Sequence, residues 1–106
     1  MQPDLNRMMQ EYAKMQKGME RVQNELAEAK VEGTSGGGAV KVTCTGTFDF
    51  RSVKINKEAV DPEDVETLED LVLTAIKDAC NKAQELGQKK MSASLGNIQL
   101  PPGMGF

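Results

Sequence analysis

The residues in this sequence whose type and spacing suit a chemical task are basic, and they lie in its first quarter. Arg7, Lys14 and Arg21 recur every seven residues, and Lys17 falls between the last two. On a helix this spacing puts Lys14, Lys17 and Arg21 in one patch on one side. A row of cations of this kind can contact phosphate oxygens. Periodicity alone favours the plainer interpretation, a solvated helix face with no ligand.

Other chemistries have little support in the residue types. The chain has no histidine, and Cys44 and Cys80 form no CxxC pair, so neither the commonest general base nor a zinc site is available. Acids cluster between positions 61 and 70 without the spacing of a calcium-binding loop. They are Asp61, Glu63, Asp64, Glu66, Glu69 and Asp70. We therefore expect no enzyme, no metal, no cofactor and no small-molecule substrate.

The basic patch depends on a long helix, and an apolar stripe predicts one over residues 3 to 29 or 30. The stripe follows a 3-4-3-4 spacing and consists of Leu5, Met8, Tyr12, Met15, Met19, Val22, Leu26 and Ala29. Pro3 and Asp4 suit the first turn. A stripe that repeats every 3.5 residues stays in line only against another helix, as in a coiled coil. The helix, about 40 Å long, therefore needs a long partner, and the basic patch faces away from that contact.

Three short antiparallel strands are expected next. The segments 39–46 and 50–55 alternate apolar and polar residues, and a short extended segment at 31–35 precedes them. Gly36, Gly37 and Gly38 lie between the first two segments. They precede a strand and lack the Lys-Ser/Thr pair of a phosphate-binding loop, which predicts a flexible turn.

A second long helix is predicted from 61 to 94. Asp61 is its expected N-cap and Pro62 its first residue. We expect one broad buried face, widened at the front by Leu71 and Leu73. The other members of this face are Val65, Leu68, Val72, Ala75, Ile76, Ala79, Ala83 and Leu86.

The rear of the second helix carries Lys77, Lys82, Lys89 and Lys90. Lys82 and Lys89 each follow an acid by four residues, Asp78 and Glu85, so both lysines are candidates for intrahelical ion pairs. Residues 1–94 form the single expected domain. The Pro- and Gly-containing tail, 95–106, has no regular period and is expected to be flexible or extended.

The composition indicates a soluble cytoplasmic protein. No run approaches the length of a membrane span, and both cysteines fall at apolar positions, where buried free thiols and a reducing compartment are expected. The net charge is -3 and the pI about 5.0, which argues against a polyanion partner at first sight. Outside positions 61–70, however, thirteen basic residues face ten acidic ones. The charge is segregated, not uniformly negative.

Three segments together resemble the YbaB/EbfC family of bacterial nucleoid-associated proteins. They are VEGTSGGGAVKV at 31–42, LEDLV at 68–72 followed by Ala75, Asp78 and Ala79, and LPPG at 100–103. The resemblance covers essentially the whole chain. It implies an α+β subunit of order α-β-β-β-α that forms a tight homodimer with tweezer-like helical arms.

The resemblance also implies a function, which is binding of double-stranded DNA in the nucleoid, with effects on DNA compaction and gene expression. Family contacts attributed to the arms correspond here to Arg7, Lys14, Lys17 and Arg21, and to Lys82, Lys89 and Lys90. A different class of function stays open from the residues alone. A helix-hairpin-helix module resembling prefoldin-like chaperones would use the methionines of the first helix to grip apolar partners.

Overall fold

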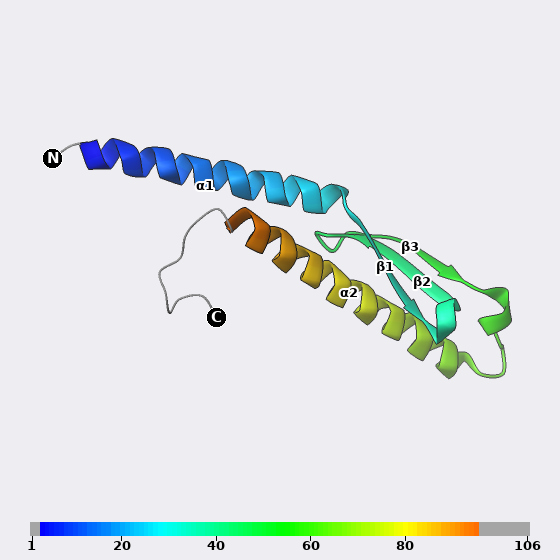
Figure 1. Cartoon of the computed structure of the whole chain (residues 1–106). Helices are drawn as coiled ribbons and strands as arrows, with labels where there is room; N and C mark the ends of the chain where they lie inside the picture. Colours follow the sequence, from blue (N-terminus) through cyan, green and yellow to red (C-terminus); the bar gives the residue numbers. More distant parts are fainter. Residues whose placement is uncertain (1–2, 96–106) are drawn as a thin grey trace, which may run out of the picture.

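The computed structural model describes residues 3–95, and the predicted α-β-β-β-α order is confirmed (Figure 1). The elements are α1 (Pro3–Glu28), β1 (Lys30–Ser35), β2 (Val40–Thr45), β3 (Phe50–Ile55) and α2 (Val65–Leu95). Two short 3-10 turns, η1 (Gly36–Gly38) and η2 (Lys57–Ala59), follow β1 and β3. The tail after residue 95, for which we expected flexibility, lies outside the described residues.

The strands form one antiparallel sheet in the order β1-β2-β3. The predicted glycine turn links β1 to β2. Gly36, Gly37 and Gly38 have φ values of 58°, 68° and 98°, a conformation that glycine adopts without the steric cost of a side chain. Three such residues in succession explain why the chain needs glycine here.

The core lies between α2 and the first two strands. Val40, Val42 and Cys44 of β2 are fully buried against a row of alanines on α2, Ala75, Ala79 and Ala83. β1 comes closest to the helix. A Cβ atom on Gly33 would lie 2.7 Å from the Ala79 Cα, and closer still to the Ala75 carbonyl oxygen and the Ala79 amide nitrogen. Gly33 and the alanines therefore bring two backbones into direct contact.

α2 does not cover β3. The register pairs Val53 with Val42 and Ile55 with Val40, so both side chains lie on the face of the sheet that carries the core. Even so, Val53 is 49% exposed and Ile55 is 40% exposed. Phe50, the partner of Cys44, is likewise exposed. The core face of the sheet continues past the helix as uncovered apolar surface.

The prediction that Val65 and Leu73 belong to the buried face of α2 was wrong, because both are about half exposed. One flank of α2 is hydrogen-bonded to β1, through Asp78 and Lys82. Helical spacing puts Val65 and Leu73 toward the other flank, on the side of β3. They lie beside the uncovered strand instead of over the core.

The predicted start of the second helix was also wrong, by about one turn. Asp61 caps a turn, accepting from the Glu63 amide at 3.0 Å, while the Asp64 amide donates to the Asp61 carbonyl. The helix begins at Val65, and Asp64 is its N-cap, accepting from the Thr67 amide and hydroxyl. Asp61 and Asp64 have the same capping chemistry. Asp61 caps the turn, and Asp64 caps the helix.

α1 projects from this body as an arm, which makes the molecule elongated at 75 × 28 × 16 Å (Figure 1). Val22 and Leu26 are buried, whereas the stripe residues from Leu5 to Met19 are 50–65% exposed. At the base of the arm the Gly46 amide donates to the Leu26 carbonyl at 2.8 Å. A Cβ on Gly46 would meet that same carbonyl oxygen, also at 2.8 Å. The stripe thus finds a partner within the described chain only over its last turns.

Gly33→Ala should lower the free energy of unfolding by about 3 kcal/mol, because the new methyl group would overlap the backbone of α2. Urea unfolding at a fixed protein concentration measures this loss. Gly87→Ala is the control, because a Cβ there has room, 4.0 Å from Leu26 Cδ1, and alanine favours a helix by about 1 kcal/mol. Equal effects of the two substitutions would contradict the proposed close approach.

Candidate nucleic-acid interface

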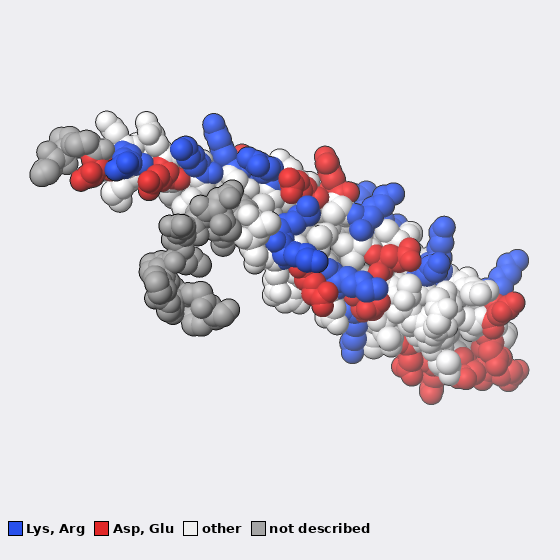
Figure 2. Space-filling view, in the orientation of Figure 1, with Lys and Arg blue, Asp and Glu red and all other residues white. Residues whose placement is uncertain are grey.

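The basic ridge, Arg7, Lys14, Lys17 and Arg21, lies exposed along α1. Helical spacing places it on the side of the arm opposite the apolar stripe. None of the ion pairs found within residues 3–95 involves these four side chains. Figure 2 shows basic side chains along the arm, and the acidic cluster at the far end of the molecule, where α2 begins. The ridge is therefore well separated from the largest negative patch.

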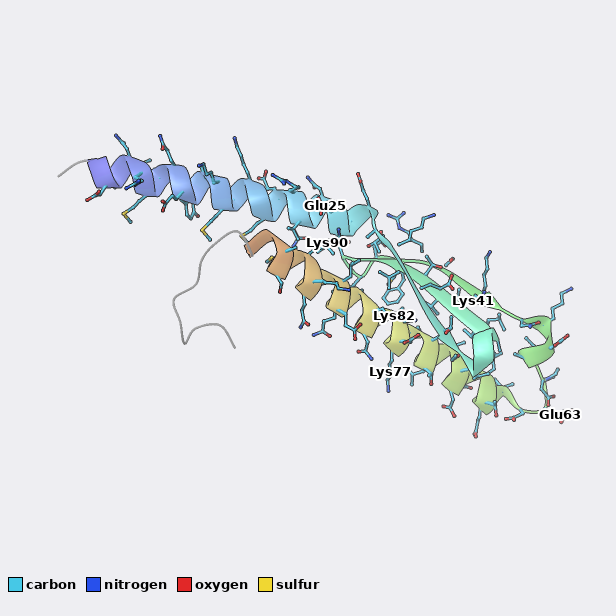
Figure 3. All side chains as sticks on the ribbon, viewed as in Figure 1. Glu25, Lys41, Glu63, Lys77, Lys82 and Lys90 are labelled. Atoms are coloured by element: carbon cyan, nitrogen blue, oxygen red, sulfur yellow. The ribbon has the colours of Figure 1, made fainter. Side chains whose placement is uncertain are left out.

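Lys90 is held at the base of the arm and is not free for a ligand. Its Nζ atom lies 3.3 Å from the Glu25 carboxylate, which joins α2 to α1 (Figure 3). This pair connects residues 65 positions apart in the sequence. Lys90 therefore contributes to the angle between the two helices.

Lys82 also has partners within the chain. Its Nζ lies 3.1 Å from Asp78 Oδ2, the predicted intrahelical pair, and donates to the Glu32 carbonyl oxygen at 3.2 Å. The same Asp78 oxygen accepts the Thr34 amide at 2.9 Å. This bond from Thr34, followed by the hydrogen bond from Lys82, lowers the pKa of Asp78 below its usual value. Lys89 is exposed, and its expected pair with Glu85 does not form.

Comparison with known proteins gives this interface a context. The family model described as the YbaB/EbfC DNA-binding family matches residues 1–98. The chain belongs to the YbaB/EbfC family. It is 44% identical over 98 residues to a nucleoid-associated protein of Pelotomaculum thermopropionicum, with 92% of this chain and 93% of the relative covered. A nucleoid-associated protein of a Bradyrhizobium strain is 46% identical over 99 residues, covering 93% of each chain.

The fold is similar to that of a solved structure as well. An uncharacterized protein of Helicobacter pylori superposes on this YbaB/EbfC subunit with a TM-score of 0.70, covering 83% of this chain and 91% of the other. The two sequences are 19% identical, so the likeness concerns the fold. The overall fold is therefore shared at low sequence identity.

In this family member the sequence did not reveal two long-range contacts, those of Glu25 with Lys90 and of Asp78 with the Thr34 amide. Asp78 was expected only as the intrahelical partner of Lys82. For Asp78 one signal was available, because it is a charged residue on the edge of the expected buried face of α2. A carboxylate at such a position needs hydrogen-bond donors from the neighbouring element.

An apolar cleft of about 690 Å³ lies between α1 and α2 at the base of the arm. Its apolar lining includes Met19, Leu26, Phe48 and Met91, and its polar lining includes Gln23, Gln84 and Gln88. Gly46 and Gly87 also line it, where the absence of side chains keeps the space open. The cleft continues the exposed stripe of α1 into the body of this YbaB/EbfC subunit.

The two cysteines are free thiols that differ in burial. Cys44 is buried as expected, but Cys80 is only half-buried, because it lies on the flank of α2 near the uncovered strand. Burial, and then the nearby Cys80, raises the pKa of Cys44, which keeps that thiol protonated and unreactive. Within residues 3–95 no group of three or more acidic or thiol side chains could hold a metal ion. Neither helix has a stretch long and apolar enough to cross a membrane, over the same residues.

Asp78→Ala should destabilise the folded protein near neutral pH, because the Thr34 amide and Lys82 lose their shared acceptor. The pKa of Asp78 is lowered by folding. Its stabilising contribution is therefore complete above the unfolded-state value of about 3.9 and disappears as the pH falls through the folded-state value. Urea unfolding across this pH range should show the difference from the unsubstituted protein shrinking toward acid.

The matched control for this measurement is Asp70→Ala. Asp70 lies on the same helix, and within residues 3–95 it takes part in no side-chain hydrogen bond or ion pair. A difference between Asp78→Ala and the unsubstituted protein that stays constant with pH would show that the carboxylate charge has no role.

Proposed function

We propose that this protein binds double-stranded DNA as a homodimer, with phosphate contacts made by the basic ridge of two helical arms. Its membership of a DNA-binding family supports the partner. The observation that carries the proposal is the two-sidedness of α1. One side of the projecting arm is basic and makes no ion pair within residues 3–95, and the other side is apolar and exposed. A helix of this kind meets a protein on one side and a polyanion on the other.

The uncovered apolar surface supports self-association. Phe50, Val53 and Ile55 on β3 are exposed apolar residues on the core side of the sheet, and helical spacing puts the exposed Val65 and Leu73 of α2 toward the same side of the subunit. Exposed apolar residues gathered on one side of a subunit are typical of a protein–protein contact site. A second copy of the chain is the proposed occupant, since a twofold axis near β3 would bury the same patch on both subunits.

The arms follow from the same assembly. In the proposed dimer the stripe from Leu5 to Met19 rests against the partner subunit, which supplies the long helical contact that the 3.5-residue period needs. The ridge then points outward. Two ridges on one particle can hold separate points along a duplex, and this arrangement would bend or compact DNA and so affect gene expression in the nucleoid.

Removing two ridge charges should weaken DNA binding and reduce its salt dependence. For Lys14→Gln/Lys17→Gln, each lost phosphate contact lowers the slope of log K against log salt by about 0.9, hence by about 1.8 per chain. The measurement is a titration of a labelled duplex with dimer of verified mass, between about 50 and 200 mM salt. Lys57→Gln/Lys77→Gln is the control, since it removes the same charge from η2 and α2.

The result is decisive in either direction. Binding that depends steeply on salt, and that the ridge variant loses while the control keeps it, supports the proposal. Salt-independent affinity, or equal losses in the two variants, would contradict a phosphate-binding ridge on α1. No binding at low salt would contradict DNA as the partner.

Val53→Asp should convert the dimer to a monomer, because it puts a charge in the centre of the apolar patch. Light scattering and sedimentation measure the mass directly. Ser52→Asp is the control, since Ser52 is adjacent on β3 but faces the opposite side of the sheet. Unchanged mass of Val53→Asp, or dissociation of both variants, would place the subunit contact elsewhere.

A second function is favoured by one observation, the apolar cleft that continues the exposed methionines of α1. A module that grips apolar partner proteins would use this surface, and methionine adapts to varied shapes. The two candidates differ in their dependence on charge. Suppression of the aggregation of an unfolded client, unaffected in Lys14→Gln/Lys17→Gln, would favour the protein-binding module.

A further inference from the structure

The face of the sheet that α2 leaves open is polar and carries three lysines. Alternation along the strands and the register between them define its members. These are Lys30, Glu32 and Thr34 on β1, Lys41, Thr43 and Thr45 on β2, and Ser52 and Lys54 on β3. Thr45 is buried, and the other seven are exposed or half-buried. We call this surface the open sheet face.

Two of its lysines stand directly opposite each other. Lys41 and Lys54 are Cα partners in the β2–β3 ladder, which puts their Cβ atoms about 4.5–5.5 Å apart. Like charges in this position repel and destabilise a sheet. None of the ion pairs within residues 3–95 involves Lys30, Lys41 or Lys54. The sheet therefore keeps an unfavourable contact that an uncharged residue at either position would relieve.

We propose that the open sheet face binds the sugar-phosphate backbone of duplex DNA, with Lys41 and Lys54 holding a phosphate between their ammonium groups. The inference rests on the proposed DNA-binding function and adds to it a second contact surface on the body of the subunit. A bound phosphate turns the repulsion between the lysines into a shared attraction. It also gives the two cations at these paired positions a common role.

The composition of the face selects a duplex backbone over other anionic partners. Thr43 and Ser52 lie between the lysine rows and supply hydroxyl donors of the kind that contact phosphates. The strand residues of this face include no aromatic side chain, since Phe50 lies on the other side with Cys44. Stacking on single-stranded bases and insertion into a lipid surface both need such groups. The one acid among these strand residues, Glu32, lies at the β1 end of the row that holds Thr43 and Ser52, next to the row of the lysine pair.

The open sheet face is also placed to act with the arm. Lys30 follows the end of α1 by two residues. Figure 2 shows basic side chains recurring along one side of the molecule, from α1 over the body to the far end. The proposed dimer contact uses the opposite side of β3, so the lysine pair stays accessible in the assembly.

Lysine acetylation of the intact protein, read by mass spectrometry with and without a saturating blunt-ended duplex at low salt, tests the proposal. We expect Lys41, Lys54 and Lys77 all to react in the free protein, and the duplex to protect the first two. Lys77 is the internal control, since it lies on the side of α2 away from the sheet (Figure 3). Protection of Lys41 and Lys54 without DNA would overturn the proposal, since the face would then be buried in the assembly.

Substitution gives the second arm of the test. Lys54→Gln should weaken duplex binding about three- to tenfold at low salt and lower the salt slope by about 0.9. The Tm of the free variant should rise or hold, because the repulsion with Lys41 is gone. Lys77→Gln is the matched control for loss of a single charge. A fall in Tm together with affinity would indicate structural damage and would overturn the assignment of this role to Lys54.

Failure of this inference is distinguishable from failure of the proposed function. Duplex binding that is lost in the ridge variant Lys14→Gln/Lys17→Gln, yet unchanged in Lys41→Gln and Lys54→Gln, leaves the DNA-binding function standing and removes the open sheet face from it. Protection of the lysine pair by phosphatidylserine vesicles but not by duplex DNA would also overturn it. Absence of any duplex binding by the unsubstituted protein would remove both proposals.

Discussion

The close approach of β1 to α2 is the constraint on which the rest of the structure depends. Gly33 has no side chain, and Ala75 and Ala79 have small ones, so the strand and the helix meet backbone to backbone. The Thr34 amide beside this contact then reaches the Asp78 carboxylate, and the Ser35 hydroxyl reaches the Leu71 carbonyl. A helix fixed so tightly over the first strand cannot also extend over the third.

The arrangement explains why the subunit has so much uncovered apolar surface. The largest fully buried side chains are Val40, Val42 and Cys44, and a core of small residues gains little from burial. Larger side chains, such as Phe50 and Ile55, lie outside it. The apolar area that would stabilise an independent domain is thus displayed on β3 and along α1. In the proposed dimer, folding and association would be coupled, because this apolar area would be buried between the subunits.

The sequence predicted the parts of this structure that repeat. The 3-4 stripe gave α1, the alternation gave β2 and β3, and three glycines gave the turn between β1 and β2. The DNA-binding family also followed from the sequence, through motifs spread over the chain. The start of α2 could not be predicted, because Asp61 and Asp64 are equivalent caps until the neighbouring turn is known.

Features that depend on contacts between distant segments could not be predicted from the sequence. The exposure of Val65 and Leu73 depends on which strands α2 covers, and this depends on Gly33. The partners of Lys82 and Lys90 likewise depend on the packing of α2 against β1 and α1. Lys41 and Lys54 lie opposite each other because of the register between β2 and β3, which is irregular at Thr43 and Cys44. Periodicity predicts on which face of a helix or strand a residue lies, but the tertiary fold determines which element that face contacts.

The helical arm α1 is attached to the body of the subunit only through its last turns. Contacts at Leu26 and Gly46 and the Glu25–Lys90 pair hold only its last turns. From Val22 to its first residue, Pro3, the helix extends about 28 Å, so a 10° rotation at the base would move the tip by about 5 Å. Small differences in packing at Gly46 are therefore amplified into displacements of the arm tip. In the proposed dimer, the separation of the two basic ridges would be determined at this joint, far from the side chains that would contact the phosphates.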